Sequence, residues 1–225
     1  MAVYQAPEYH PAFEEYCEAI FELHEDDVDV IQARIADRLE VSRPAVSEMI
    51  RRMEAHGLVT IDRTVSLTPS GLELAERVVR RHRLAERFLT DVLGLSWATA
   101  HTEAGKWEHV ISAPVEEAMD RLLGSPTTCP HGNPIPGSSY TPPDTVTTLD
   151  TIAIGSSFVV RRITEELEFT DGLLDFLEAS SVQPGQVGTV TAVSPDGTTT
   201  VEIGGRHVGL SSFVSTRIQV AADEG

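Results

Sequence analysis

The sequence predicts a mainly α-helical protein with some β-structure. A winged helix–turn–helix comes first, a helical region follows, and a small β-barrel comes last. Helical periodicity dominates residues 12–124 and is interrupted by two β-rich runs within residues 58–68, whereas short β-rich runs separated by glycine turns fill residues 151–225. A chain of 225 residues can hold more than one compact unit.

Two helices are expected before the turn of the helix–turn–helix. Residues 12–25, AFEEYCEAIFELHE, and residues 29–40, DVIQARIADRLE, both repeat apolar side chains at roughly helical spacing. In the first segment these are Phe13, Tyr16, Ile20, Phe21 and Leu23, and in the second Ile31, Ile35 and Leu39. Each segment therefore predicts one amphipathic helix.

The next segment, VSRPAVSEMIRRMEAHGLV, has the start and stop signals of a third helix. Ser42 is a good N-cap, Pro44 is tolerated in a first turn, and Gly57 stands where a glycine commonly ends a helix. The following LVTIDRTVSLT predicts two β-strands around a polar turn, and TPSGLELAERVVRRHRLAERFLTDVL predicts a long helix. This order of elements is typical of a winged helix–turn–helix, whose second helix enters the major groove of DNA.

The charge distribution favours the same interpretation. Residues 30–90 contain eleven arginines and eight acids, a local net charge of +3 in a chain whose net charge is −18. An acidic chain repels nucleic acid except where it presents a basic face, and this segment supplies the candidate face. An ordinary solvated helix face is the alternative. The residues expected to contact DNA are Arg34, Ser42, Arg43, Pro44, Ser47, Glu48, Arg51 and Arg52.

The rest of the sequence adds expectations about packing and location. LGSPTTCPHGNPIPGSSYTPPDTVTT, from Leu123, is dense in Pro, Gly, Ser and Thr and is expected to be an extended linker. Cys17 and Cys129 are too few for a disulfide framework and are expected to be free thiols. There is no signal-peptide pattern and no apolar run near the roughly 18 residues of a spanning helix, so a soluble, cytoplasmic protein without a membrane partner is expected.

Imidazoles and carboxylates gather at helical spacing in three places. At about 100° per residue, His101, Gly105, Glu108 and His109 share one helix face. Two further pairs are one helical turn apart: His82 with Glu86, and Glu15 with Glu18. Any single pair is more often a solvated face, but three such groups beside a DNA-reading unit favour a divalent metal site.

Four stretches resemble the diphtheria toxin repressor family of iron- and manganese-dependent repressors: ARIADRLEVSRPAVSEMIRRMEAHGLV, LTPSGLELAERVVRRHRLAERFLTDVLGL, AGKWEHVIS and GNPIPG. The resemblance is continuous over residues 12–137. It implies a homodimer that binds a palindromic double-stranded DNA operator when loaded with metal, represses metal-homeostasis genes and catalyses no reaction. The implied domains are a DNA-binding winged helix–turn–helix (1–69), a helical dimerisation and metal-binding domain (70–137), a linker (138–150) and an SH3-like domain of the FeoA type (151–225).

The resemblance also implies ligands by position. The ancillary metal site of the family is matched by His82, Glu86, His101, Glu165 and Glu168, and the primary, activating site by Glu108 and His109. Glu15 and Glu18 match the two acids that the manganese-responsive branch has on its first helix. Gly105 stands where relatives have a Cys or a Glu ligand, so the primary site is expected to lack one ligand.

The expected cofactor is Mn²⁺ or Fe²⁺, with two ions per subunit and a preference for Mn²⁺. Carboxylates and imidazoles without sulfur suit these ions. Two alternatives stay open: a metal-dependent hydrolase, although the sequence has no HExxH motif, and a winged-helix regulator of an organic ligand in which the histidines and glutamates are structural.

Overall fold

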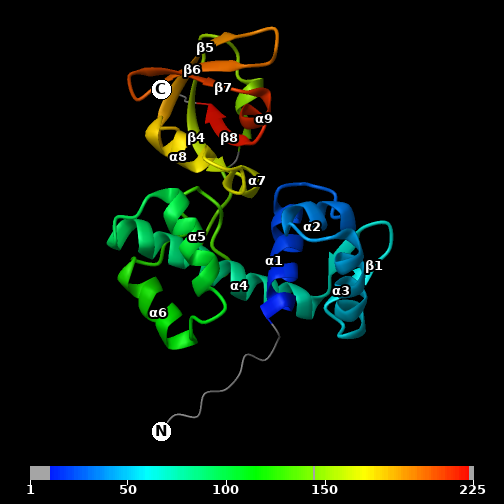
Figure 1. Cartoon of the computed structure of the whole chain (residues 1–225). Helices are drawn as coiled ribbons and strands as arrows, with labels where there is room; N and C mark the ends of the chain where they lie inside the picture. The colour runs from blue at the N-terminus through cyan, green and yellow to red at the C-terminus, as the bar shows by residue number, and fades with distance from the viewer. Residues whose placement is uncertain (1–10, 144, 223–225) are drawn as a thin grey trace.

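The computed structural model describes residues 11–143 and 145–222, which form three units with separate hydrophobic cores (Figure 1). The expected fold class is confirmed: a winged helix–turn–helix, a helical middle and a C-terminal β-sheet unit follow one another along the chain. In the described residues, no helix is long and apolar enough to cross a lipid bilayer.

The N-terminal unit is built as its capping signals predict. It contains α1 (Pro11–Glu25), α2 (Gln32–Arg38), α3 (Arg43–Ala55) and the antiparallel hairpin of β1 (Val59–Ile61) and β2 (Val65–Leu67). Ser42 caps α3 by accepting a hydrogen bond from the backbone N–H of Ala45, and Gly57 follows α3 with a φ of 70°. Ile20, Ile50 and Met53 are buried where these helices meet.

The middle unit contains α4 (Pro69–Arg87), the π-helical turn η1 (Phe88–Val92), α5 (Trp97–Trp107) and α6 (Ala113–Leu122). Thr68 caps α4, and Gly71 in its first turn is required because an added Cβ would lie 2.0 Å from the carbonyl oxygen of Leu58. The helix expected over residues 68–93 thus continues through a π turn. Helix α5 ends at Trp107, and Glu108 is its C-cap with a helical backbone conformation, so His109 lies just beyond the end of the helix.

The C-terminal unit is a six-stranded antiparallel sheet with short helices. Its elements are β3 (Thr147–Thr148), η2 (Leu149–Thr151), β4 (Ser157–Ile163), α7 (Glu165–Glu168), α8 (Leu173–Ala179), β5 (Val187–Val193), β6 (Thr199–Ile203), β7 (Arg206–Leu210), α9 (Ser212–Ser215) and β8 (Ile218–Ala222). The strand order is β3-β8-β4-β5-β6-β7, with the register shifted in β4 between Val160 and Arg162. Helix α7 follows the end of β4 and lies where the three units meet (Figure 1).

The prediction that residues 123–148 form an unpacked linker is wrong for residues 129–135. Cys129, His131, Asn133 and Ile135 are each at most 1% exposed. The loop is fixed because His131 accepts a backbone hydrogen bond from Ile163, and because Gly132 approaches the backbone of β4 too closely for a side chain. Its prolines and glycines shape a packed loop, not a flexible tether.

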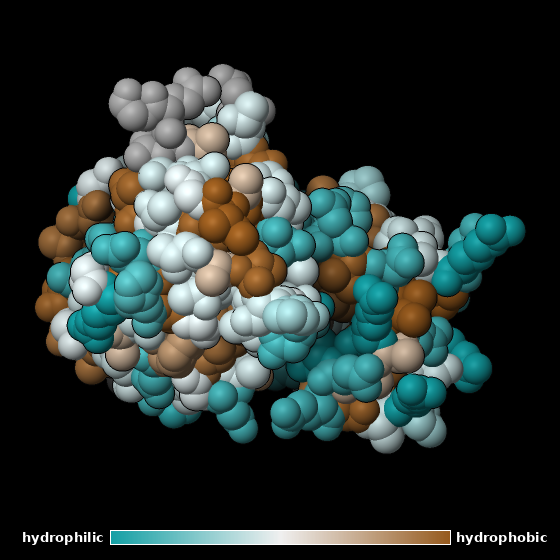
Figure 2. Space-filling view, turned by 90° about the horizontal axis from the view of Figure 1, so that it is seen from above, coloured by the Kyte–Doolittle hydropathy of each residue, from teal (hydrophilic) through white to brown (hydrophobic). Residues whose placement is uncertain are grey.

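Trp97 joins the middle and C-terminal units. Its side chain belongs to the core of the C-terminal unit, and its backbone N–H donates a 3.0 Å hydrogen bond to Glu178 on α8. Seen from above, hydrophilic residues dominate the winged-helix lobe, whereas larger apolar patches cover the other lobe (Figure 2). Exposed apolar residues of the C-terminal unit include Ile154, Phe176, Val187, Val193 and Phe213.

Candidate metal centre

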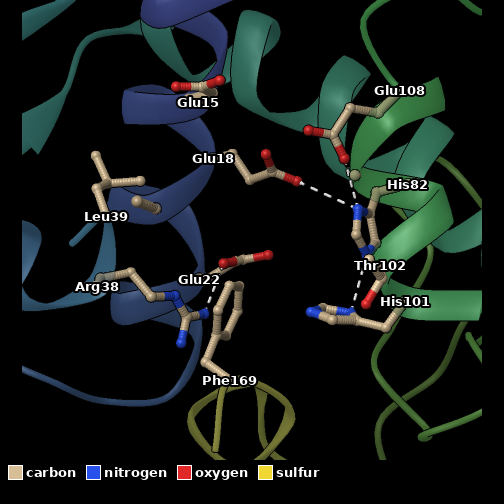
Figure 3. Close-up of a pocket in the computed structure, with 12 residues that line it drawn as sticks. Glu15, Glu18, Glu22, Arg38, Leu39, His82, His101, Thr102, Glu108 and Phe169 are labelled. Atoms are coloured by element: carbon tan, nitrogen blue, oxygen red, sulfur yellow. Dashed lines mark hydrogen bonds and ion pairs between the residues drawn. The ribbon is translucent and has the colours of Figure 1, made fainter. Parts of the chain in front are cut away.

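Carboxylates and imidazoles from α1, α4, α5, α7 and the loop after α6 converge between the three units. Figure 3 shows Glu18 of α1 and Glu108 directed toward His82 of α4, with His101 of α5 beside it. Three groups have ligand atoms close enough to share a cation: Glu18, His82 and Glu108; His82, Glu86 and His101; and Glu86, Cys129 and His131. Side chains that are separate pairs in the sequence thus form one continuous cluster.

Glu108 connects two of the histidines in this cluster. One of its carboxylate oxygens lies 2.5 Å from Nδ1 of His82, and the other lies 3.2 Å from Nε2 of His109. Glu18 lies 4.0 Å from Nδ1 of His82, and Glu15 lies 3.9 Å from Nε2 of His109. The structure therefore brings together the four residues expected at the primary site, with Glu108 between His82 and His109.

The residues expected at the ancillary site lie on the other side of His82. Nε2 of His82 is 3.3 Å from Glu86 and 3.3 Å from Nδ1 of His101. Nδ1 of His101 is 2.9 Å from Glu86 and 3.3 Å from Glu168. His82 thus lies between the two sets and faces a different carboxylate with each ring nitrogen.

Glu165 is placed differently from its expected partners. It lies on α7 with Glu168, but one of its oxygens accepts a 2.7 Å hydrogen bond from Arg83. Arg83 is fully buried and also donates to Glu25 of α1. Glu165 therefore belongs to an ion-pair network that links α1, α4 and α7, and it lies outside the three cation-sized groups of the described residues.

Sequence reasoning missed Cys129 and His131. Nδ1 of His131 lies 2.8 Å from Glu168 and 3.6 Å from Glu86, and His131 is 1% exposed. The signal was available in CPHG, where a Cys and a His two residues apart fall in a short loop, but the density of Pro and Gly favoured the linker interpretation. Cys129 also adds a sulfur to a ligand inventory that had been expected to contain none.

The predicted gap at Gly105 is an open space in the structure. A Cβ built on this glycine would meet nothing within 4 Å. Gly105 borders a cavity of about 240 Å³ that is also lined by Glu15, Glu18, His82 and Glu108. The space that a ligand side chain would fill therefore adjoins the carboxylates of the primary set.

The electrostatics of the cluster favour a bound cation. Burial and then the charge of Glu108 raise the pKa of Glu18 well above its usual range. Burial alone would lower the pKa of His101, but hydrogen bonds to Glu168 and Glu86 raise it to about 10. Glu18 and His101 thus retain protons, whereas the neighbouring histidines lower the pKa of Glu86 and Glu168 despite their burial, and a cation can replace the retained protons.

Unsatisfied atoms test directly whether a metal fits. Within the described residues, buried atoms without a hydrogen-bond partner include one oxygen of Glu18 and Nε2 of His131, whereas Nδ1 of His131 contacts Glu168. Such atoms are costly in a protein interior unless something binds them. Carboxylate and imidazole donors are ligands of Mn²⁺ and Fe²⁺, so the residues present fit these ions.

Sequence profiles of one repressor family match most of the chain. The profile described as iron dependent repressor, N-terminal DNA binding domain, matches residues 9–64. The one described as iron dependent repressor, metal binding and dimerisation domain, matches residues 68–137, and that of the FeoA domain matches residues 147–222. These three matches cover all three units of the structure.

Individual relatives agree with the profiles. The chain is 38% identical over 219 residues to the iron-dependent repressor IdeR of Mycobacterium tuberculosis, covering 92% of this chain and 95% of the relative. It is 45% identical over 146 residues to the diphtheria toxin repressor of Corynebacterium diphtheriae, covering 64% of this chain and 60% of that protein.

Solved structures share the fold over nearly the whole length. A manganese-dependent transcriptional repressor in complex with manganese superposes with a TM-score of 0.83 at 31% identity, covering 93% of this chain and 99% of that chain. IdeR of T. acidophilum superposes with a TM-score of 0.77 at 28% identity, covering 98% of this chain and 100% of that chain. The repressor ScaR with bound Zn²⁺ superposes with a TM-score of 0.75 at 28% identity, covering 94% of this chain and 99% of that chain.

Proposed function

Because this chain belongs to the diphtheria toxin repressor family of iron-dependent repressors, we propose how it senses metal: ligands on α1, α4 and α5 hold Mn²⁺ or Fe²⁺ and thereby fix the winged helices for operator binding. The chain is a metal-dependent transcriptional repressor and not an enzyme. Its metal-binding domain takes a divalent metal, and its matched domains imply DNA and a second copy of the chain as partners.

One observation carries the proposal. Glu18 is on α1, whose apolar residues form the core of the winged-helix unit, yet its carboxylate lies 4.0 Å from His82 on α4. A cation held by both residues ties the DNA-reading unit to the dimerisation helices. If the metal binds the DNA-competent arrangement more tightly, it shifts the population toward that arrangement. The factor by which metal raises the affinity for DNA must then equal the factor by which DNA raises the affinity for metal.

We propose two ion sites per subunit. The primary set is Glu15, Glu18, Glu108 and His109, with His82 at its border; the ancillary set is His82, Glu86, His101 and Glu168, joined by Cys129 and His131. One oxygen of Glu165 is paired with Arg83, and its other oxygen is buried without a hydrogen-bond partner, so we keep Glu165 as a candidate at the edge of the ancillary set. The primary set offers oxygen and nitrogen donors that suit Mn²⁺ and Fe²⁺, whereas Cys129 gives the ancillary set a softer donor.

The surface of α3 supports the proposed DNA contacts. Most of the side chains expected to read DNA are exposed: Arg34, Ser42, Arg43, Pro44, Glu48, Arg51 and Arg52, with Ser47 half-buried. We propose that two such surfaces, one from each subunit, read the half-sites of a palindromic operator.

Exposed apolar residues support the homodimer. Val92, Leu93, Val110, Val115 and Leu122 are each about half exposed or more, and all lie in or beside η1, α5 and α6. Large apolar side chains exposed on a helical unit are typical of a subunit interface when they form a patch. We propose that this part of residues 70–124 pairs the two copies.

DNA binding with defined metals tests the proposal. A preferred sequence selected from random duplexes is titrated in anisotropy assays with Mn²⁺, anaerobic Fe²⁺, Zn²⁺, Co²⁺ or a chelator. We expect binding to require metal and to be lost in Glu108→Gln, while the exposed control Glu103→Gln behaves as wild type. Chelator-resistant binding would instead support a regulator of an organic ligand with structural histidines.

A further inference from the structure

A buried glutamate on α1 contacts the primary site from outside the proposed ligand set. Glu14 is 2% exposed, although it lies in the first turn of α1, next to the half-exposed Glu15. Its carboxylate lies 2.7 Å from Nδ1 of His109. No arginine or lysine in residues 11–143 and 145–222 forms an ion pair with it. The imidazole of His109 is therefore the side chain that satisfies this buried carboxylate.

The two ring nitrogens of His109 have different surroundings. Nδ1 faces Glu14, whereas Nε2 lies 3.2 Å from Glu108 and 3.9 Å from Glu15. The nitrogens of an imidazole point away from each other, so a cation bound at Nε2 lies on the side of the ring opposite Glu14. His82 contrasts with this arrangement, because both of its nitrogens face proposed ligands, Glu108 and Glu86.

We propose that Glu14 is a positioning residue for the metal: it accepts the Nδ1–H of His109 and so directs the lone pair of Nε2 into the primary site. A neutral histidine binds metal through one nitrogen, and the hydrogen bond made by the other nitrogen decides which tautomer is present. A carboxylate partner also makes the ligating nitrogen a stronger donor. The inference rests on the proposed function, because it concerns the same primary site.

The hydrogen bond also joins two units before metal arrives. Glu14 and His109 are 95 residues apart, on α1 of the winged-helix unit and directly after α5 of the dimerisation unit. Orienting His109 in advance reduces the conformational entropy that metal binding must remove. Because Gly105 supplies no ligand, correct placement of the remaining ligands matters more at this site than in relatives with a full set.

The test compares Glu14→Ala and Glu14→Gln in the full chain, with Glu103→Gln as an exposed glutamate control. Calorimetric titration with Mn²⁺ alone measures affinity. Nitrogen-15 NMR of histidine-labelled, metal-free protein at alkaline pH reports the tautomer of His109. We expect Glu14→Ala to weaken Mn²⁺ at the primary site by about 10- to 100-fold and to mix the tautomers of His109. Glu14→Gln, whose amide oxygen still accepts from Nδ1–H, should keep the wild-type tautomer and most of the affinity.

Two results would overturn the inference while leaving the proposed function intact. One is a wild-type tautomer together with wild-type Mn²⁺ affinity in Glu14→Ala. The other is loss of affinity in Glu14→Gln as large as in Glu14→Ala with the tautomer unchanged, which would make Glu14 a direct ligand. Failure of the wild-type chain to bind Mn²⁺ at all would overturn the proposed function itself.

Discussion

Replacing Gly105 with Glu tests how the primary site works. The substitution adds a carboxylate beside the cavity that Glu15, Glu18 and Glu108 line, and an added Cβ would meet nothing within 4 Å. The new side chain therefore fits without displacing the backbone. It adds a side chain where the family resemblance implies a ligand, while Gly105→Gln adds the same volume without charge and serves as the matched control.

Rough energies predict whether Gly105→Glu stabilises the protein without metal and with Mn²⁺. Removing a glycine from a helix interior stabilises it by about 0.5–1 kcal/mol. Two like charges about 4 Å apart repel by about 4 kcal/mol at an effective dielectric constant of about 20, so the added carboxylate should destabilise the metal-free protein despite the helix gain. A divalent cation between the carboxylates reverses that sign. We expect Mn²⁺ to bind at least about tenfold more tightly, which corresponds to about 1.4 kcal/mol.

Calorimetry and thermal unfolding measure both effects. With Gly105→Glu, the unfolding temperature should fall without metal and rise with Mn²⁺. With Gly105→Gln, it should rise slightly both without metal and with Mn²⁺. In the wild type the ancillary site should fill before the primary site. If Gly105→Glu binds Mn²⁺ no more tightly than Gly105→Gln, another group already occupies the gap and the reasoning fails.

Three other predictions concern DNA, assembly and protons. We expect Arg51 to contact phosphate, so Arg51→Ala should weaken binding to all DNA sequences alike and reduce the salt slope by about 1, as anisotropy over a salt series measures; a changed base preference would contradict that assignment. Sedimentation with Mn²⁺ should show a dimer, and a monomer at micromolar concentration would exclude the interface on residues 70–124. Because hydrogen bonds to Glu168 and Glu86 outweigh burial and raise the pKa of His101 to about 10, its contribution to metal-free stability should be complete below its ordinary pKa of 6.5 and lost as pH rises through 10. Mn²⁺ affinity should instead rise with pH over that range with proton release, and calorimetry in buffers of different ionisation enthalpy would contradict this by detecting no proton release.

Local features of the sequence determine much of the fold. The N-cap at Ser42, the glycine after α3 and the apolar spacing of α1 are properties of neighbouring residues, so they could be read without knowing what packs where. The same holds for His82 and Glu86, which one helical turn necessarily places on the same face. The resemblance to a repressor family added the SH3-like type of the C-terminal unit and the assignment of ligands to two metal sites.

Only the tertiary structure decided which of these side chains meet. Glu165 was expected beside Glu168 as a ligand, and the structure shows that one of its oxygens is the ion-pair partner of the buried Arg83. His131 and Glu14 became visible because a Pro-rich loop packs against β4 and because the first turn of α1 reaches His109, which follows α5. These contacts join residues tens of positions apart, and no periodicity encodes them, since they depend on how whole units pack together. Helix spacing fixes which face a residue occupies, whereas packing fixes what that face touches.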